Sequence, residues 1–583
     1  MTSPARRTIF LNGTVLAMDG KAAAQQACVI EGSRIVAIGD EETMHSAAGT
    51  DAEIVDLDGA TLMPGLIDSH PHAMHFTGFE VGFVDLLDAR DFDDVIARIR
   101  AAAARTPEGQ WIVTTPIGEP HYFVARNWSH LAEGAFPDRH VLDQASQAHP
   151  IHIAAWAPKT PNVCGFNTLG LQRMGLTRHF PEKVAGVEIE RDEHGELTGI
   201  LKGKVNNYYS DDPFWLFLNQ KLPVPPDAFW ELAGWAGMRK WNRMGVTAMY
   251  EAHAMAPPHV QAYLNLRAKG LSTVRVQQSL ELSGYAFSPL DYSEEEVWAL
   301  MALAEQLTNK TDEMCRVNGV TFVRGGPPWQ GFLRMNDPYR GPDGLMTTGR
   351  TFFGRAVEQR VAKHCLDNNV RLNMVLGGYR DADDFLQTVD ELAGAYDIRA
   401  RKWVLQHCSF TKPEHVERYA AYDFDATMSC SFVYGEGDML RERFGTDVLK
   451  DLVPLKRFWD AGMNLSCGTD WGPSDVFRQM ALNETREFAG SGYRNQFDDH
   501  ILTREQSLLS FTRNGARTMQ WDGIGSLLPD YRADMVILDR NPMEGAPERL
   551  AETQVLRTIL DGEAVYDSGA INGGAIRALP PLP

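Results

Sequence analysis

The 583 residues of the chain are enough for a large core plus a second module, and 44% hydrophobic with 23% charged residues is ordinary for a soluble globular protein. The formal net charge of -21 argues against nucleic acid and anionic membrane surfaces as partners, because phosphate binding needs a basic face. We see no signal peptide, no membrane-spanning run and no CxxC pair among the seven scattered cysteines, so we expect a cytoplasmic protein with reduced thiols.

The first part of the chain, residues 7–62, alternates short apolar runs with Asn-Gly and Asp-Gly turns, which predicts hairpins of a small antiparallel sheet. Residues 533–539 and 555–566, near the other end, have the same strand-and-turn character. Neither piece can bury a core by itself, so we expect one composite β-sandwich domain built from residues 1–63 and 525–575. Two separate small β modules are the alternative.

Between these pieces, residues 64–524 alternate strand-like apolar runs with amphipathic helix candidates, about eight times. This repeated order predicts an α/β fold, a parallel (β/α)8 barrel of the TIM type, whose chemistry sits at the C-terminal ends of the strands. Residues 85–225 interrupt the rhythm and are rich in Trp, Pro and His. We interpret them as an insertion after the first strand that forms a lid or a substrate pocket.

The first barrel strand ends in a pattern that indicates a metal site. A Pro-Gly turn and the apolar pair Leu66-Ile67 precede His70 and His72, which are separated by one residue. Side chains alternate along a strand, so both imidazoles should point the same way and could hold one divalent ion. A lone pair of histidines is weak evidence, but its place at the end of a barrel strand favours metal binding.

Two further strand-like runs end in candidate site residues. Asp470, in Gly468-Thr469-Asp470, follows the apolar run 463–467, and we expect it to be a metal ligand and the general base. Capping of the next helix is the alternative for Asp470. His407 follows the run 403–406, and we favour a site role for it over that of a satisfied core or loop histidine.

These motifs, taken together and in this order, resemble the amidohydrolase superfamily, specifically its amidohydrolase-3 (YtcJ-like) branch, over nearly the whole chain. The resemblance is carried by Asn12-Gly13 with residues 35–39, by residues 63–72, by Leu405-Gln406-His407, by Gly468-Thr469-Asp470, and by residues 502–508 and 525–539. It implies a (β/α)8 barrel with a composite β-sandwich and one or two divalent metals, usually zinc. It also implies hydrolysis of C–N bonds other than ordinary peptides, by a homodimer or a larger homo-oligomer.

The chain departs from this family at two positions that would hold a second metal. Thr321 stands where two-metal relatives place a bridging carboxylated lysine, and Met374 stands where they carry a histidine after the fifth strand. Neither threonine nor methionine is a good ligand for zinc. We therefore predict a single divalent ion, expected to be Zn²⁺, or none. Its ligands would be His70, His72 and Asp470, with His407 as a fourth ligand or a hydrogen-bonding group.

Two other residues are candidates for the same site. Glu251, at the end of the second strand-like run and in phase with His253, could complete the single-metal site, with a structural hydrogen-bonding role as the equal alternative. Arg324 could anchor an anionic substrate, or it could polarise the substrate carbonyl as His407 could. A salt bridge within the barrel is the alternative for Arg324.

The function expected from the resemblance and these residues is that of a metal-dependent hydrolase. It would cleave an amide-like, non-peptide C–N bond of a small aromatic or apolar substrate through a metal-activated water, with Asp470 as general base. One alternative keeps the single-metal site for C–C bond hydrolysis, decarboxylation or hydration. Another is a binding protein with a degenerate metal site. Fold alone does not separate these alternatives.

Overall fold

An eight-stranded parallel sheet forms the centre of the computed structural model, which describes residues 7–21, 23–118, 127–155, 162–205, 212–282, 293–308 and 312–579. Its strands in chain order are β7 (Leu66–Asp68), β14 (Val246–Met255), β15 (Arg275–Glu281), β16 (Cys315–Val323), β19 (Leu372–Leu376), β20 (Val404–His407), β21 (Asp425–Met428) and β22 (Asn464–Cys467). Neighbours in this order pair in parallel. The edge strands also meet, because the Ser69 amide donates to the Cys467 carbonyl and the Asp470 amide to the His70 carbonyl. The predicted barrel is confirmed.

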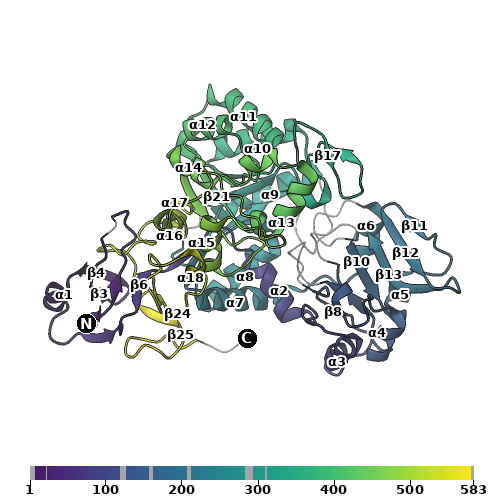
Figure 1. The fold of residues 1–583 in the computed structure, drawn as a ribbon, viewed down its shortest axis with the longest axis horizontal. Helices are drawn as coiled ribbons and strands as arrows, with labels where there is room; N and C mark the ends of the chain where they lie inside the picture. Colours follow the sequence, from purple (N-terminus) through teal and green to yellow (C-terminus); the bar gives the residue numbers. More distant parts are fainter. Residues whose placement is uncertain are drawn as a thin grey trace.

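Helices surround this sheet and connect its strands (Figure 1). They are α2 (Ala73–Gly82), α7 (Asp227–Arg243), α8 (Pro257–Ala268), α9 (Glu294–Thr308), α10 (Arg355–Asn368), α11 (Tyr379–Ala393), α12 (Pro413–Ala421), α13 (Ser431–Phe444), α14 (Leu455–Asp460), α15 (Val476–Thr485), α16 (Arg504–Ser510) and α17 (Arg513–Thr518). Side chains of strands and helices together make the largest buried core, which includes Trp241, Leu266, Phe385 and Leu405. The barrel is thus packed as alternating strands and helices predict.

The two ends of the chain meet in one β-sandwich, at the left of Figure 1. One sheet contains β4 (Arg34–Gly39), β3 (Ala27–Glu31), β1 (Arg7–Leu11) and β5 (Glu53–Asp56), and the other contains β2 (Thr14–Val15), β6 (Thr61–Pro64), β23 (Met535–Leu538), β24 (Val555–Leu560) and β25 (Glu563–Asp567). β6 from the first part of the chain pairs antiparallel with β23 from the last, with Leu62 opposite Ile537. The composite sandwich is therefore confirmed, whereas the domain boundaries drawn from the sequence stay a prediction.

The predicted insertion contains a sheet of its own, at the right of Figure 1. Its strands, in sheet order, are β11 (Lys183–Val184), β12 (Val187–Arg191), β13 (Leu197–Gly203), β10 (Asn162–Phe166), β9 (Ile151–Ile153) and β8 (Ile112–Thr114). Four helices accompany them, namely α3 (Phe92–Ala103), α4 (Arg139–Ala145), α5 (Thr168–Met174) and α6 (Pro213–Asn219). Two apolar clusters stabilise this part of the chain, which we call the inserted module.

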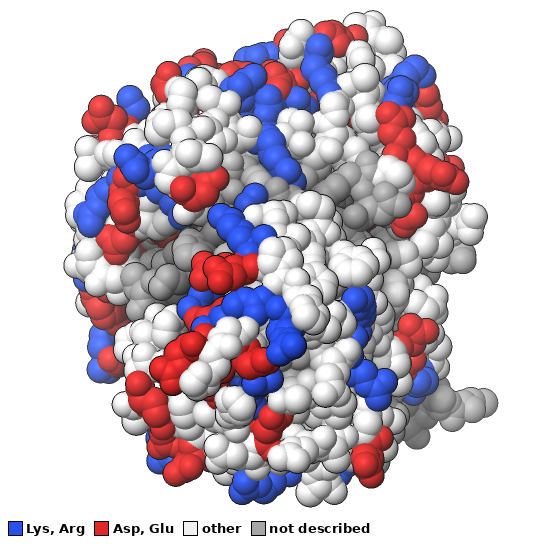
Figure 2. Space-filling model, turned by 90° about the vertical axis from the view of Figure 1, so that its right-hand side faces the viewer, with Lys and Arg blue, Asp and Glu red and all other residues white. Residues whose placement is uncertain are grey.

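Acidic and basic side chains are mixed on the surface shown in Figure 2, and the exclusion of nucleic acid and membrane partners stays a prediction. Figure 2 shows the side of the molecule formed by the inserted module, where acidic and basic side chains are interspersed without a continuous basic field. In the part of the chain that the structure describes, no helix is long and apolar enough to cross a membrane.

A buried ion network joins the barrel to the sandwich. Arg275 on β15 is fully buried, and its guanidinium donates to Asp534 at 2.7 and 3.0 Å and to Asp561 at 2.6 Å. Asp534 lies directly before β23 and also accepts the amide of Asp561. Because this arginine lies between two carboxylates from the other end of the chain, it fixes the two domains against each other.

We predict that Arg275→Met destabilises the protein by about 3 kcal/mol, because it leaves Asp534 buried without its counter-charge. The measurement is the shift of the urea unfolding midpoint. Arg360→Met is the matched control, since Arg360 is exposed and pairs with Glu294 on the surface, where an ion pair contributes about 0–1 kcal/mol. Equal midpoints for the two variants would contradict the proposed joint.

Candidate metal centre

Four imidazoles and one carboxylate converge at the C-terminal ends of the barrel strands. His70 and His72 follow β7, His253 lies near the end of β14, His407 ends β20, and Asp470 follows β22. The ring centroid of His70 lies 5.0 Å from that of His72, 5.0 Å from that of His407 and 5.6 Å from that of His253. The structure thus brings His70, His72, His407 and Asp470 close together, and their function as a site stays a prediction.

The tightest group of possible ligands consists of His70, His407 and Asp470, whose ligand atoms lie within 4.8 Å of one another. Nε2 of His407 is 3.4 Å from Nε2 of His70 and 3.5 Å from Oδ2 of Asp470. Nε2 of His72 approaches the other oxygen, Oδ1, of Asp470 at 3.5 Å. His407 is thus as close to the middle of the cluster as His70. His72 approaches Asp470 from the side of its other carboxylate oxygen, Oδ1.

The backbone of this group is held in an uncommon conformation. His72, His407 and Asp470 have φ angles of 48°, 64° and 48°, in the left-handed region that residues with a Cβ seldom adopt. Such strain collects at functional sites and persists only where the surrounding structure over-determines it. Gly468 allows the approach of the two loops, because a Cβ there would lie 2.6 Å from the amide nitrogen of His70.

Asp68 supplies that over-determination and was not singled out from the sequence. Its fully buried carboxylate accepts hydrogen bonds from the hydroxyl and amide of Thr469 at 2.6 and 3.1 Å. It also accepts one from the Trp241 indole at 2.9 Å and one from the His70 amide at 3.2 Å. One side chain therefore ties the loop of His70 to the loop of Asp470. Its signal in the sequence was an aspartate that ends an otherwise apolar strand.

The electrostatics of the cluster suit a bound cation. Burial, followed by the neighbouring imidazoles, holds the pKa of His70 well below its usual value, and burial also lowers the pKa of His253 and of His407 to about 3. Burial opposes ionisation of Asp470 as well, but His407 and His72 outweigh it and lower the pKa of that carboxyl. At neutral pH the imidazoles of His70, His253 and His407 keep their lone pairs, and Asp470 is an anion.

Unsatisfied polar atoms mark the same place. Within the described ranges, neither carboxylate oxygen of Asp470 has a hydrogen-bond partner, and neither does Nε2 of His72. Burying an ionised carboxylate without a hydrogen-bond partner costs several kcal/mol. A bound cation would offset this cost. Imidazole nitrogens with one carboxylate oxygen are the donor set that zinc accepts in catalytic sites. The residues present therefore fit a divalent ion of this kind.

Glu251 lies outside the group formed by His70, His407 and Asp470, and its part in the metal site stays a prediction. Its carboxylate accepts hydrogen bonds from the Tyr263 hydroxyl at 2.8 Å and from the Met74 amide at 3.3 Å. Both partners belong to helices outside the barrel, α8 and α2. The register of β14 shifts between Glu251 and Met255, so strict alternation along this strand fails.

His253 reaches the cluster instead. Its ring centroid lies 5.4 Å from that of His72 and 5.3 Å from that of His407. Nδ1 of His253 lies 2.5 Å from a carboxylate oxygen of Glu281 at the end of β15, a contact that orients the ring. In a regular strand, the side chains of His253 and Glu251 would point to the same face. The irregularity of β14 makes them point in different directions.

Arg324 belongs to a buried ion network, which corrects its expected role at the substrate. Its guanidinium pairs with Glu358 and with Asp384, the latter at 2.8 Å. Arg334 shares the Asp384 carboxylate at 2.7 Å. With its charge already engaged by carboxylates, Arg324 is not presented to the metal cluster, and the salt-bridge alternative describes it better.

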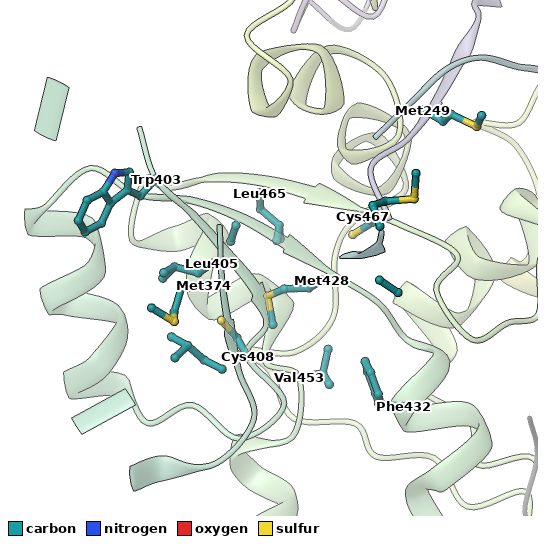
Figure 3. Close-up of a cluster of buried hydrophobic side chains, with 14 of the residues drawn as sticks. Met249, Met374, Trp403, Leu405, Cys408, Met428, Phe432, Val453, Leu465 and Cys467 are labelled. Carbon is teal, nitrogen blue, oxygen red and sulfur yellow. The ribbon is translucent and has the colours of Figure 1, made fainter. Parts of the chain in front are cut away.

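The two departures from the two-metal pattern have separate structural explanations. Thr321 lies inside the barrel, where its hydroxyl contacts that of Ser279 at 2.8 Å and donates to the Ala252 carbonyl. Met374 lies among buried apolar side chains near Leu405, as Figure 3 shows, and does not face the site. On β19 it is Val375 that faces the site. Side chains alternate along a strand, so the prediction that Met374 occupies this position was wrong by one residue.

A cleft with aromatic walls lies beside the cluster and has a volume of about 430 Å³, counting space open to solvent. His253, His407, Val323, Gly325, Gly326, Pro327, Pro328, Trp329, Leu333, Val375, Gly377, Ser409, Phe432 and Trp471 line it. Trp471 stacks on His72 with 5.1 Å between ring centroids, and the Phe432 ring lies 4.9 Å from that of His407. The walls beside the cluster are therefore mainly apolar, as in other small-molecule sites.

Comparison with known proteins agrees with this geometry. The Amidohydrolase family (Amidohydro_3) matches residues 53–566. An N-substituted formamide deformylase of Arthrobacter pascens is 25% identical over 96% of this chain and 98% of its own length. An uncharacterized metal-dependent hydrolase from Pyrococcus furiosus superposes with a TM-score of 0.69, at 18% identity, over 92% of this chain and all of its own.

A second solved structure shows the same fold more distantly. Atrazine chlorohydrolase TrzN from Arthrobacter aurescens TC1, complexed with zinc, superposes with a TM-score of 0.52 at 13% identity, over 96% of this chain and 95% of its own. The family match spans most of the sequence and includes the barrel, the strands after it and every residue of the cluster. The chain belongs to the amidohydrolase family and is a hydrolase that acts on C–N bonds.

Proposed function

We propose that this protein hydrolyses N-substituted formamides, or closely similar small amides, whose N-substituent is aromatic or apolar, with one bound Zn²⁺. The observation that carries the proposal is the ionised carboxylate of Asp470, which accepts no hydrogen bond within the described residues and lies beside the neutral imidazoles of His70 and His407, next to a cleft with aromatic walls. The similarity to an N-substituted formamide deformylase along 96% of the chain supports the bond type. A formyl group also suits a cleft of this size better than a long acyl chain does.

The ion would be held by His70, His407 and Asp470, with His72 or His253 as further donors. When bound, it would supply Lewis-acid catalysis and make water more acidic. A single ion agrees with the absence of ligand types at Thr321 and Val375, the positions of β16 and β19 that face inward.

The chain's own residues supply the remaining chemistry. Asp470 is an anion at neutral pH, so it would accept a proton from the attacking water and return it to the leaving nitrogen. Formamide and water would thereby yield formate and an amine. Nε2 of His72 lies 3.5 Å from Oδ1 of Asp470 and would fix the orientation of that carboxylate. Trp329, Phe432 and Trp471 would hold the apolar substituent and exclude water from the reacting carbonyl.

The first test is turnover of zinc-loaded protein on a panel of N-substituted formamides, with formate and amine quantified. We predict that Asp470→Asn lowers kcat/KM by about 10³-fold or more, because the variant loses both a ligand and the proton acceptor. Exposed Asp498→Asn is the control and should keep wild-type turnover. Products of C–C cleavage, decarboxylation or hydration from a related keto or aromatic panel, with no amine released from any formamide, would contradict the proposal.

The second prediction concerns substrate choice. Trp329 is 2% exposed and lines the cleft, so Trp329→Ala should remove about 1.5–3 kcal/mol of apolar contact with an aromatic N-substituent. That loss corresponds to about 10–100-fold in kcat/KM for the aromatic formamide. For N-methylformamide, which is too small to reach the wall, the change should be several-fold smaller. An equal loss for both substrates would show that Trp329 does not contact the substituent.

A further inference from the structure

A second hollow lies between the inserted module and the barrel, away from the metal centre. Its empty volume is about 1190 Å³, counting space open to solvent. The residues that line it are Gly82, Phe83, Trp111, Val113, His152, Ala154, Asn219, Gln220, Leu222, Pro223, Val224, Pro225, Pro226 and Phe229. None of them lines the cleft at the metal centre. Pockets for small molecules form preferentially at such junctions between parts of a fold.

The position of α2 separates the two sites. His72 precedes the first residue of α2, whereas Gly82 and Phe83 stand at its far end. A helix of this length spans about 15 Å, so a molecule in the hollow would lie too far from the cluster to touch it. The hollow is therefore a separate site, and its assignment does not depend on the proposed hydrolase reaction.

The floor of the hollow is one face of the module's sheet. Val113 on β8 pairs with His152 on β9. Trp111 lies two residues before Val113, and Ala154 lies two residues after His152. Side chains alternate along a strand, so these residues share a face. The opposite wall comes from Phe83 and from the proline-rich turn and helix start at residues 222–229. Both walls present aromatic and aliphatic surface.

His152 is the polar side chain among the apolar residues of this floor. It is 1% exposed, and its ring stacks on Phe166 with 4.5 Å between centroids and 16° between planes. Nδ1 lies 3.3 Å from the Gly165 carbonyl, so this nitrogen carries the hydrogen and Nε2 carries the lone pair. Among the residues that the structure describes, Nε2 has no hydrogen-bond partner. A buried hydrogen-bond acceptor that stays unsatisfied in this way calls for an explanation.

Charge narrows the class of ligand. No lysine, arginine, aspartate or glutamate is found among the described residues that line the hollow. Burial lowers the pKa of His152 to about 4, so its ring is neutral at physiological pH. An ionic ligand would find no counter-charge here, whereas a neutral one would lose little on leaving water.

We propose that this hollow binds a neutral aromatic molecule that donates one N–H or O–H to Nε2 of His152. The ligand's ring would lie against Trp111 and Phe229, and its donor would satisfy the buried acceptor. The chemistry resembles that of other small-molecule sites, with mainly apolar walls and a few polar groups, here His152 with the amides Asn219 and Gln220.

Indole and 1-methylindole form a matched pair of probes, since they differ in the N–H donor. Isothermal titration of the zinc-loaded full-length protein should give saturable binding of both, with indole tighter by about 5–10-fold, the usual contribution of one neutral hydrogen bond. His152→Phe should keep the stack on Phe166 and abolish this preference. Equal affinities of the two probes for the wild type, or a preference that survives in His152→Phe, would overturn the proposal.

Two further variants locate the bound probe. Val224 is 74% exposed at the rim, so Val224→Trp should fill the hollow without disturbing the fold, and both probes should then lose at least tenfold in affinity. Trp329→Ala, in the cleft of the metal centre, should leave the affinities unchanged. Binding that is lost in Trp329→Ala but kept in Val224→Trp would place the probes at the metal centre. No saturable binding up to millimolar probe would reject the site altogether.

Discussion

The structure of the metal centre depends on one buried carboxylate, that of Asp68. Four hydrogen bonds reach it, from Thr469, Trp241 and the His70 amide, and they bring the first and last barrel strands together at their C-terminal ends. Burial raises the pKa of Asp68, and the hydrogen bonds it accepts from Thr469 and Trp241 oppose that rise. Without this joint at Asp68, the loops that carry His70 and Asp470 would be held by the backbone hydrogen bonds of Ser69 to Cys467 and of Asp470 to His70 but would lose their shared side-chain anchor.

The joint explains why an ionised group can be buried nearby. Asp470 is fully buried, and its carboxylate lies 3.5 Å from the imidazole nitrogens of His72 and His407. In the protein alone this arrangement is costly, because a charge is taken out of water with little in return. Binding of a cation would offset the cost, so part of the stability of this end of the barrel should be coupled to metal binding.

Much of this architecture could be predicted from sequence, and the exceptions have physical causes. The turns of the two chain ends and the strand–helix rhythm between them predicted the sandwich and the barrel. The sequence pointed to His70, His72, His407 and Asp470 because each lies at, or a few residues beyond, the end of an apolar strand. The directions of Glu251 and His253 were less predictable, because alternation assumes a regular strand and β14 shifts register between Glu251 and Met255. For the same reason His253 was passed over.

Other features depend on contacts that no local pattern contains. Arg324 follows a strand as the site residues do, but its direction is set by Glu358 and Asp384, which come from helices far along the chain. The pairing of Asp68 with Thr469 spans most of the sequence. The homodimer and the cytoplasmic location expected from the sequence stay predictions.

Metal content per chain tests the account most directly. Elemental mass spectrometry of the purified protein should give about one zinc per chain, and close to none in His70→Ala and in Asp470→Asn, because each variant removes a ligand of the cluster that suits zinc among the described residues. The exposed control Asp498→Asn should retain the wild-type content. Two ions per chain, or a zinc content that neither ligand variant lowers, would contradict a single ion bound by His70, His407 and Asp470.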